Sequence, residues 1–287
     1  MDYKKVILVI PYRGIGDLIF HLPLLKGLYK KYKSKIFIIT NAVNKAKYLF
    51  NKEASVKKIE YINYQREDQI KNSFLFLKKL NNYKADVCIL TAPSRRLIIP
   101  LLMSNTKKKI YFKKDNTKDL SKYIINQSEK TFKDINFPKD YHLSFPKKRI
   151  TAKKIFLSVD SHHNQNNWKE RYFIKLIDKL LIIKKIKKIY INFSPNNFKI
   201  FKKIFKKFYK EKKIFFTNKD KFKNIIKIIN NCSYIISNES GPACIGASLD
   251  KNVFSIYDPK HTPNLSSKII NKKINYLNSK KLSHEII

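Results

Sequence analysis

The sequence predicts an α/β fold with two domains of similar size, each built on a parallel sheet. Short β-branched or aromatic runs alternate with longer segments of helical period, a rhythm typical of βαβ units. The 287 residues, 43% of them hydrophobic, are enough for two domains of ordinary size. A polar, strand-poor stretch at 113–149 separates two such series and indicates the domain boundary.

The first domain is expected to span 1–149, with 113–149 as helix plus linker. Its five strands are expected at 5–10, 35–40, 56–62, 86–91 and 108–112. Helices are expected at 17–33 and 68–80, because apolar residues recur there at three- and four-residue spacing. The apolar run 97–103, flanked by Arg95 and Arg96, suggests a buried helix more than a cleft-side or membrane-facing one.

The second domain is expected to span 150–287. Strands are expected at 154–159, 188–193, 213–216, 234–237 and 252–257, and helices at 170–183, 196–210 and 221–231. Parallel sheets in two domains that face each other bound a central cleft, and ligands usually bind at the carboxyl ends of the strands. The motifs that carry chemistry fall at such strand ends.

The chain is strongly basic, with 62 Lys and Arg against 21 Asp and Glu and a formal net charge of +41. This charge requires either an anionic partner or a compositional bias toward lysine. Only six of the basic residues are arginine, the lysines are spread through nearly every segment, and no RNA-binding signature is present. A nucleic-acid partner is therefore not expected.

Cysteine content and apolar runs indicate the compartment. Cys88, Cys232 and Cys244 are isolated from one another, so neither a disulfide framework nor a zinc cluster is expected, and a reducing cytoplasm fits. The longest apolar runs fall far short of the roughly 20 residues that a membrane span requires. The protein is expected to be soluble or attached to a membrane surface.

The first motif, 11–17, lies between the first strand and the first helix. Gly14 and Gly16 allow a tight turn and a close approach of the backbone to a ligand. Asp17 suits two roles: a helix cap alone, or a general base that the positive helix end keeps ionised. Ile19 occupies the third glycine position of a dinucleotide fingerprint, so a dinucleotide is not indicated.

The second motif, 237–244, follows an apolar strand and precedes a helix. Small residues before a helix N-terminus present N–H groups to an anion, so a diphosphate is a natural ligand. The alternative is a plain strand-to-helix turn with Pro242 at the first helical position.

The third motif, 160–170, is another loop between a strand and a helix. His162 and His163 are adjacent, but the usual spacing of metal ligands is missing, so polar loop residues are favoured over a metal site. Trp168, the only tryptophan, is expected to pack at the helix start rather than stack on a base.

Together these motifs resemble glycosyltransferase family 9, the ADP-heptose:lipopolysaccharide heptosyltransferases. The resemblance rests on Gly14-Ile15-Gly16-Asp17 with Pro23 six residues on, Trp168 with Phe173 five residues on, and Asn238-Glu239-Ser240-Gly241-Pro242. It implies a GT-B fold, with 1–149 as the acceptor-binding Rossmann-like domain and 150–287 as the nucleotide-sugar-binding one. It also implies an inverting, metal-independent transfer of heptose or a similar sugar. The donor would be a nucleotide diphosphate, such as an ADP-linked one, and the acceptor a lipopolysaccharide core or related glycolipid.

The resemblance also assigns roles to residues. Asp17 is the expected base, in an acceptor-side loop with Arg13, Gly14 and Gly16. The residues expected to bind the nucleotide sugar are Ser161, Lys169, Asn238, Glu239, Ser240 and Gly241. Neither a metal nor a cofactor is expected.

The chain departs from the family pattern at three positions. Asn166 stands where the family commonly has a Lys, Cys244 where it commonly has a His, and Glu239 where it usually has an Asp. Lys169 could supply positive charge from the other side of Trp168. These departures leave open the alternative that the protein is an inactive homologue, which binds a nucleotide sugar without transferring it. A basic nucleic-acid-binding protein is a further, less favoured alternative.

The charge has a further implication if the acceptor is a glycolipid. Basic surface residues are attracted to the anionic cytoplasmic leaflet. The expected location is therefore the cytoplasm, with peripheral contact at the inner face of the membrane.

Overall fold

The computed structural model describes residues 5–62, 69–117, 119–146, 153–160, 168–194, 201–217, 219–257 and 274–278. The chain divides into two compact units, Met1–Ser144 and Phe145–Ile287. This division comes a few residues before the boundary at 149/150 expected from the sequence.

Unit 1 contains a five-stranded parallel sheet in the order β3-β2-β1-β4-β5. The strands are β1 (Val6–Ile10), β2 (Ile36–Asn41), β3 (Val56–Ile62), β4 (Val87–Leu90) and β5 (Lys108–Tyr111). Every residue of β1 and β4 is buried, as expected for central strands covered by helices on both faces. The strand order reverses between β1 and β4, and we call such a point a switch point.

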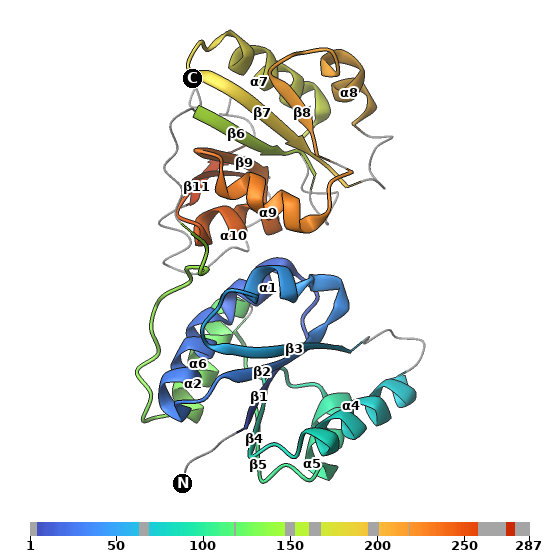
Figure 1. Ribbon diagram of the computed structural model, residues 1–287, viewed down its shortest axis with the longest axis vertical. Coiled ribbons are helices and arrows are strands. Elements are labelled where there is room, and N and C mark those ends of the chain that lie inside the picture. The colour runs from blue at the N-terminus through green and yellow to red at the C-terminus, as the bar shows by residue number, and fades with distance from the viewer. Residues whose placement is uncertain are drawn as a thin grey trace. The chain divides into compact units, whose positions relative to one another are not determined.

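Helices cover both faces of this sheet. They are α1 (Ile15–Phe20), α2 (Leu22–Tyr32), the 3₁₀ turn η1 (Ala42–Asn44), α3 (Ala46–Phe50), α4 (Gln69–Tyr83), α5 (Arg95–Met103) and α6 (Leu120–Thr131). Figure 1 shows α2 and α6 on one side of the sheet and α4 and α5 on the other. The connections therefore build the doubly wound arrangement that the alternating sequence pattern predicts.

The single helix expected at 17–33 is two helices that meet at His21. Pro23 lies in the first turn of α2 and has no N–H, so it cannot continue the hydrogen-bond ladder of α1. The His21 N–H instead closes α1 by donating to Leu18 O, and the His21 carbonyl accepts from Leu25 N–H in α2. The break places the His21 side chain beneath the loop that precedes α1.

Unit 2 repeats this plan with a six-stranded parallel sheet in the order β11-β10-β9-β6-β7-β8. The strands are β6 (Lys153–Ser158), β7 (Ile186–Asn192), β8 (Ile214–Phe216), β9 (Tyr234–Asn238), β10 (Asn252–Tyr257) and β11 (Ile274–Asn278). Counted from β6, this is the strand order of a dinucleotide-binding Rossmann fold, and its switch point lies between β6 and β9. The sequence did not predict β11, a short edge strand whose parallel pairing with β10 defines it.

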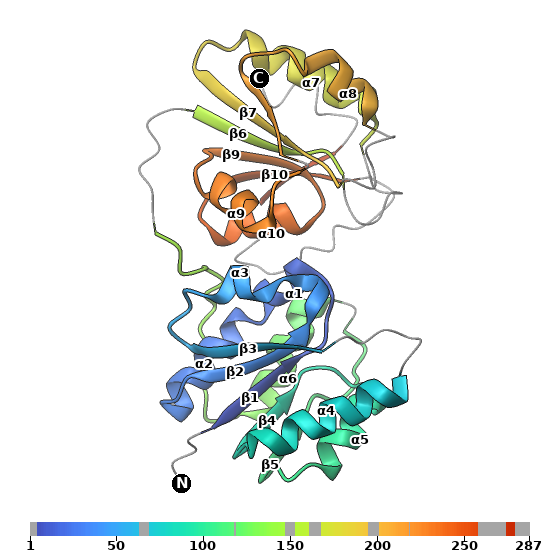
Figure 2. The same ribbon diagram turned by 45° about the vertical axis from the view of Figure 1, so that its right-hand side comes forward.

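Four helices of the described residues cover this second sheet. They are α7 (Glu170–Ile182), α8 (Lys202–Phe208), α9 (Phe222–Asn230) and α10 (Gly241–Ser248). Figure 2 shows α7 and α8 on one face and α9 and α10 on the other. α10 packs so closely on β9 and β10 that a Cβ atom on Gly246 would lie 2.8 Å from Ile235 Cγ1. Both units are thus Rossmann-like, as in the GT-B fold.

Candidate functional site

The loop 11–14 follows β1 at the switch point of unit 1 and leads into α1. Gly14 caps the start of α1 with φ −75° and ψ 145°, and no glycine of the described residues has a positive φ. The turn therefore does not need glycine for its backbone conformation, contrary to the sequence expectation. A Cβ atom on Gly14 would lie 2.7 Å from Asp17 Oδ2, so the absence of a side chain leaves room for the Asp17 carboxylate.

Asp17 is half-buried in the first turn of α1, three residues after the capping residue. Its Oδ2 accepts a hydrogen bond from Gly14 N–H at 2.9 Å, which is one half of a capping box, because glycine has no side chain that could accept in return. Burial raises the pKa of Asp17, and the Gly14 hydrogen bond opposes this shift. The net direction is opposite to the one expected from the helix end alone. A desolvated carboxylate is the better proton acceptor, which suits general base chemistry.

His21 holds this helix from inside the protein. Its side chain is completely buried, with Nδ1 2.6 Å from Asp17 O and Nε2 2.9 Å from Thr91 Oγ1. Because a carbonyl oxygen only accepts, Nδ1 carries the proton of the neutral ring. Burial lowers the pKa of His21 to about 4, so the ring is neutral at pH 7. Thr91 directly follows β4, and His21 therefore joins α1 to the strand on the other side of the switch point.

Further polar groups, buried or half-buried, fix the same loop. Tyr12 Oη donates to Thr91 O at 3.0 Å, and burial raises the pKa of this phenol. Asn44 Nδ2 donates to Tyr12 O at 3.0 Å and lies 2.6 Å from Thr40 Oγ1, which in turn donates to Ile10 O at 2.6 Å. The loop is thus held from both neighbours of β1.

Sequence reasoning missed these supporting residues. Their signal was present, since Thr40 and Thr91 are polar residues at the ends of apolar strands. Their convergence on the loop after β1 depends on the strand order, however. Of the other expected acceptor-side residues, Arg13 is exposed and Gly16 is the second residue of α1.

The corresponding loop of unit 2 joins β9 to α10. Ser240 caps α10 in an extended conformation, but its side chain makes no capping hydrogen bond; its Oγ lies 2.7 Å from Ser237 Oγ instead. Pro242 follows in the first turn and has no N–H. The start of α10, at Gly241, is therefore a helix end without a side-chain cap, the arrangement in which an external anion accepts from backbone N–H groups.

Asn238 joins the two sides of the second switch point. It is completely buried; its Nδ2 donates to Val159 O at 2.7 Å, and its Oδ1 accepts from Trp168 N–H at 3.0 Å. Val159 follows β6, so Asn238 holds both the exit of β6 and the start of α7 against β9. This internal role differs from the direct contact with a nucleotide sugar expected from the sequence.

The remaining donor-side residues lie around this loop. Glu239 is half-buried and its N–H donates to Ile256 O at 3.1 Å, whereas Lys169 is exposed at the start of α7. Ser161 lies outside the described residues, as do the neighbouring His162, His163 and Asn166.

Trp168 and Cys244 face the interior of unit 2. Trp168 packs edge-on against Phe173, with ring centroids 4.9 Å apart, which confirms its expected role at the helix start. Cys244 is buried in α10.

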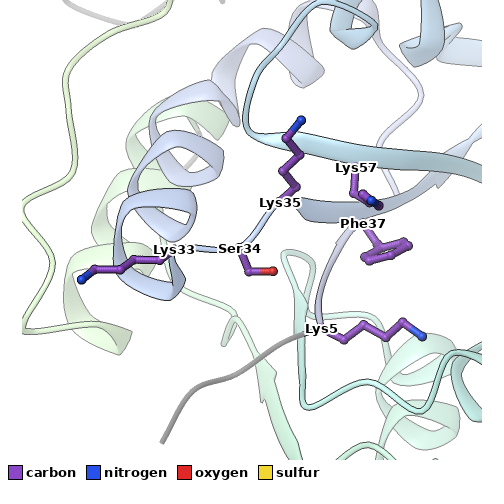
Figure 3. A pocket seen from close by; sticks show the side chains of 6 residues that line it. All are labelled: Lys5, Lys33, Ser34, Lys35, Phe37 and Lys57. Atoms are coloured by element: carbon purple, nitrogen blue, oxygen red, sulfur yellow. The ribbon is translucent and has the colours of Figure 1, made fainter.

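A basic hollow of 530 Å³ opens at the other end of the unit 1 sheet. It is lined by Lys5, Lys33, Ser34, Lys35, Phe37 and Lys57. Figure 3 shows its lysine side chains pointing in different directions, and Lys5 Nζ lies 5.7 Å from the centroid of the Phe37 ring. Because Lys5 and Lys35 precede β1 and β2, this hollow lies at the opposite end of the strands from Asp17.

The part of the chain that the structure describes has neither a metal-ligand cluster nor a membrane-spanning helix. No group of three or more His, Cys, Asp or Glu side chains is placed to hold a metal ion there. No described helix has both the length and the apolar character needed to cross a membrane.

Comparison with known proteins identifies the family. The model of glycosyltransferase family 9 (heptosyltransferase) matches residues 104–286, more than half of the chain. The chain belongs to glycosyltransferase family 9. It is therefore a glycosyltransferase of the heptosyltransferase type, as the sequence motifs indicated. No curated protein matches the sequence.

Solved structures support the same fold. A family 9 glycosyltransferase from Veillonella parvula DSM 2008 aligns with a TM-score of 0.80 at 16% identity, over 100% of this chain and 90% of that one. E. coli ADP-heptose lps heptosyltransferase II aligns with a TM-score of 0.71 at 13% identity, over 95% of this chain and 90% of that one. E. coli heptosyltransferase WaaC with ADP aligns with a TM-score of 0.69 at 14% identity, over 96% of this chain and 93% of that one. At these identities the likeness shows the GT-B fold.

The buried His21 makes a specific contribution to stability that depends on pH. Its pKa in the folded protein is depressed to about 4, whereas the pKa in the unfolded chain is about 6.5. The neutral ring therefore contributes fully to the free energy of unfolding above pH 6.5, and this contribution is lost as the pH falls toward 4. We expect His21→Gln to be less stable than the wild type at pH 8. The difference should shrink by up to about 3 kcal/mol between pH 7 and pH 4. Urea unfolding of both proteins across this range measures it, and a constant difference would contradict the neutral buried ring.

Proposed function

We propose that this protein transfers heptose or a related sugar from a nucleotide diphosphate donor, ADP-linked, to a hydroxyl group of a lipopolysaccharide core or related glycolipid. The transfer inverts the anomeric centre and uses no metal. The observation that carries the proposal is the Asp17 carboxylate: it is half-buried, has a raised pKa, and lies at the switch point of the unit 1 sheet. Two E. coli WaaC structures, with ADP and with ADP-2-deoxy-2-fluoro heptose, support an ADP-linked donor.

Asp17 acts as the general base on the acceptor side. It takes the proton of the acceptor hydroxyl while that oxygen attacks the anomeric carbon from the face opposite the diphosphate. The new carbon–oxygen bond forms as the bond to the diphosphate breaks, and the electron pair of that bond leaves with the nucleotide. A single displacement of this kind inverts the anomeric configuration. General base catalysis commonly contributes about 10²–10⁴-fold in rate.

The start of α10 binds the leaving diphosphate. Backbone N–H groups around Ser240 and Gly241 donate to its oxygens, and Lys169 adds positive charge from the start of α7. Preorganised donors at developing negative charge commonly stabilise a transition state by a few kcal/mol each, which fits a site without metal. Asn238 and Ser237 position this turn, to which Glu239 also belongs. The role proposed for Ser161 is contact with the diphosphate.

The enzyme works in the cytoplasm, at the inner face of the membrane. The formal net charge of +41 favours contact with anionic lipids, and a glycolipid acceptor is available only at such a surface.

Asp17→Asn tests the base directly. Turnover should fall by about 10²–10⁴-fold, because the amide cannot accept the proton. Donor affinity should not change. The unfolding free energy at pH 7 should be equal or slightly higher, because the amide is cheaper to bury and its oxygen can still accept from Gly14 N–H.

Transfer from ADP-heptose, followed by mass spectrometry, and donor titration by calorimetry measure these effects. Full activity of Asp17→Asn would refute the base assignment. If the wild type binds the donor but does not transfer its sugar, the protein is instead an inactive homologue, the alternative that Cys244 and Asn166 suggested.

Gly14→Ala tests whether the position of the carboxylate matters separately from its chemistry. The added Cβ displaces Asp17 Oδ2, so kcat should fall about tenfold or more. The melting temperature should change little, because φ −75° suits alanine. Adding Gly14→Ala to Asp17→Ala should lower kcat no further. If Gly14→Ala lowered kcat by the same factor in the wild type and in Asp17→Ala, Gly14 would act independently of Asp17.

A further inference from the structure

Unit 1 exposes a set of large apolar side chains on two neighbouring helices. Ile70 and Phe74 of α4 are 76% and 66% exposed, and Ile99, Leu102 and Met103 of α5 are 56%, 51% and 64% exposed. We call these five side chains the α4–α5 face. Single exposed apolar residues are ordinary, but a group on packed helices marks an interaction surface.

These side chains are not needed to attach the helices to the sheet. α4 buries Phe76 and Leu80, and α5 buries Leu97 and Leu101, all in the core under β1 and β4. The apolar run 97–103, expected to be buried, is therefore only partly so. Its exposed members form a second apolar row on the solvent side of α5.

The two helices form one continuous surface. Ser73 Oγ donates to Arg96 O at 3.2 Å near the start of both helices, and Asn105 N–H donates to Asn81 Oδ1 at 2.8 Å near their ends. α4 and α5 therefore run side by side in the same direction, as Figures 1 and 2 show.

The charged side chains of these two helices have a single sign. Neither α4 nor α5 contains an Asp or a Glu. Exposed cations accompany the apolar residues: Lys71 and Lys78 on α4, and Arg95 and Arg96 on α5. Apolar side chains that enter the acyl boundary, with Lys and Arg at the headgroups, are the composition by which a surface binds an anionic bilayer.

We propose that the α4–α5 face binds directly to an anionic phospholipid bilayer. A second copy of the chain fits this surface poorly, because a symmetric contact would place Lys71, Lys78, Arg95 and Arg96 of both copies together, with no carboxylate on either helix to pair with them. The proposal specifies the membrane contact of the proposed function, but lipid binding requires no sugar donor and is measured without turnover.

Vesicle binding by the full-length protein tests the assignment. The wild type is sedimented with vesicles of phosphatidylglycerol and phosphatidylcholine in equal parts, and with phosphatidylcholine alone. The test variant replaces Phe74, Ile99 and Met103 by Ser. The matched control replaces three exposed apolar residues of unit 2, Ile182, Tyr209 and Phe215, by Ser. Because all six side chains are exposed, both variants should keep their fold, which circular dichroism checks.

The wild type and the control should bind the anionic vesicles strongly and phosphatidylcholine weakly. The test variant should lose at least about tenfold in partition coefficient. Equal binding by the test variant and the wild type, or an equal loss in the control, would overturn the proposal. A wild-type dimer that the test variant converts to a monomer would overturn it too, because the occupant would then be a second copy. Transfer to a detergent-solubilised acceptor is assayed in parallel. If the wild type binds the anionic vesicles but transfers no sugar, the result counts against the proposed function and not against this surface.

Discussion

The reversal of strand order beside the first strand of each sheet is the constraint on which the rest of this protein depends. At that point the connections leave toward opposite faces of the sheet, so the loops after the two central strands diverge and their backbone groups need other partners. In unit 1 the strands pair up to Val9 and Leu90, and beyond this point Thr91 and His21 supply the bridges. In unit 2 Asn238 does the same between Val159 and Trp168.

These bridges connect folding to the proposed catalysis. A neutral, buried His21 bonded to Asp17 O orients the first turn of α1, and this turn carries the Asp17 carboxylate into a partly desolvated position. Ionising that carboxylate costs stability, while the Gly14 N–H recovers part of the cost. Such tension between stability and activity is usual where a pKa is shifted for proton transfer. In unit 2 the Ser240 hydroxyl contacts Ser237 instead of capping α10, so the start of this helix has no side-chain cap.

Much of this could be predicted from local sequence. The buried strands have continuous apolar runs, and β3 and β10 begin and end at the expected residues. Features set by long-range contacts were not predictable in the same way: β11 exists through its pairing with β10, and Asn238 and His21 acquire their partners only once the strand order is known. The break at His21 was visible as Pro23, but the helical period on both sides concealed it. The exposure of Ile99 and Met103 was missed because an apolar run does not show which side of its helix faces the sheet.

The proposed site of the donor diphosphate is the uncapped start of α10. A crystal structure of the protein soaked with ADP tests it most directly. We expect the diphosphate oxygens to lie within hydrogen-bond distance of the backbone N–H groups around Ser240 and Gly241, with Asn238 still bonded to Val159 and Trp168. A diphosphate held elsewhere in unit 2, with the start of α10 contacting only solvent, would contradict it.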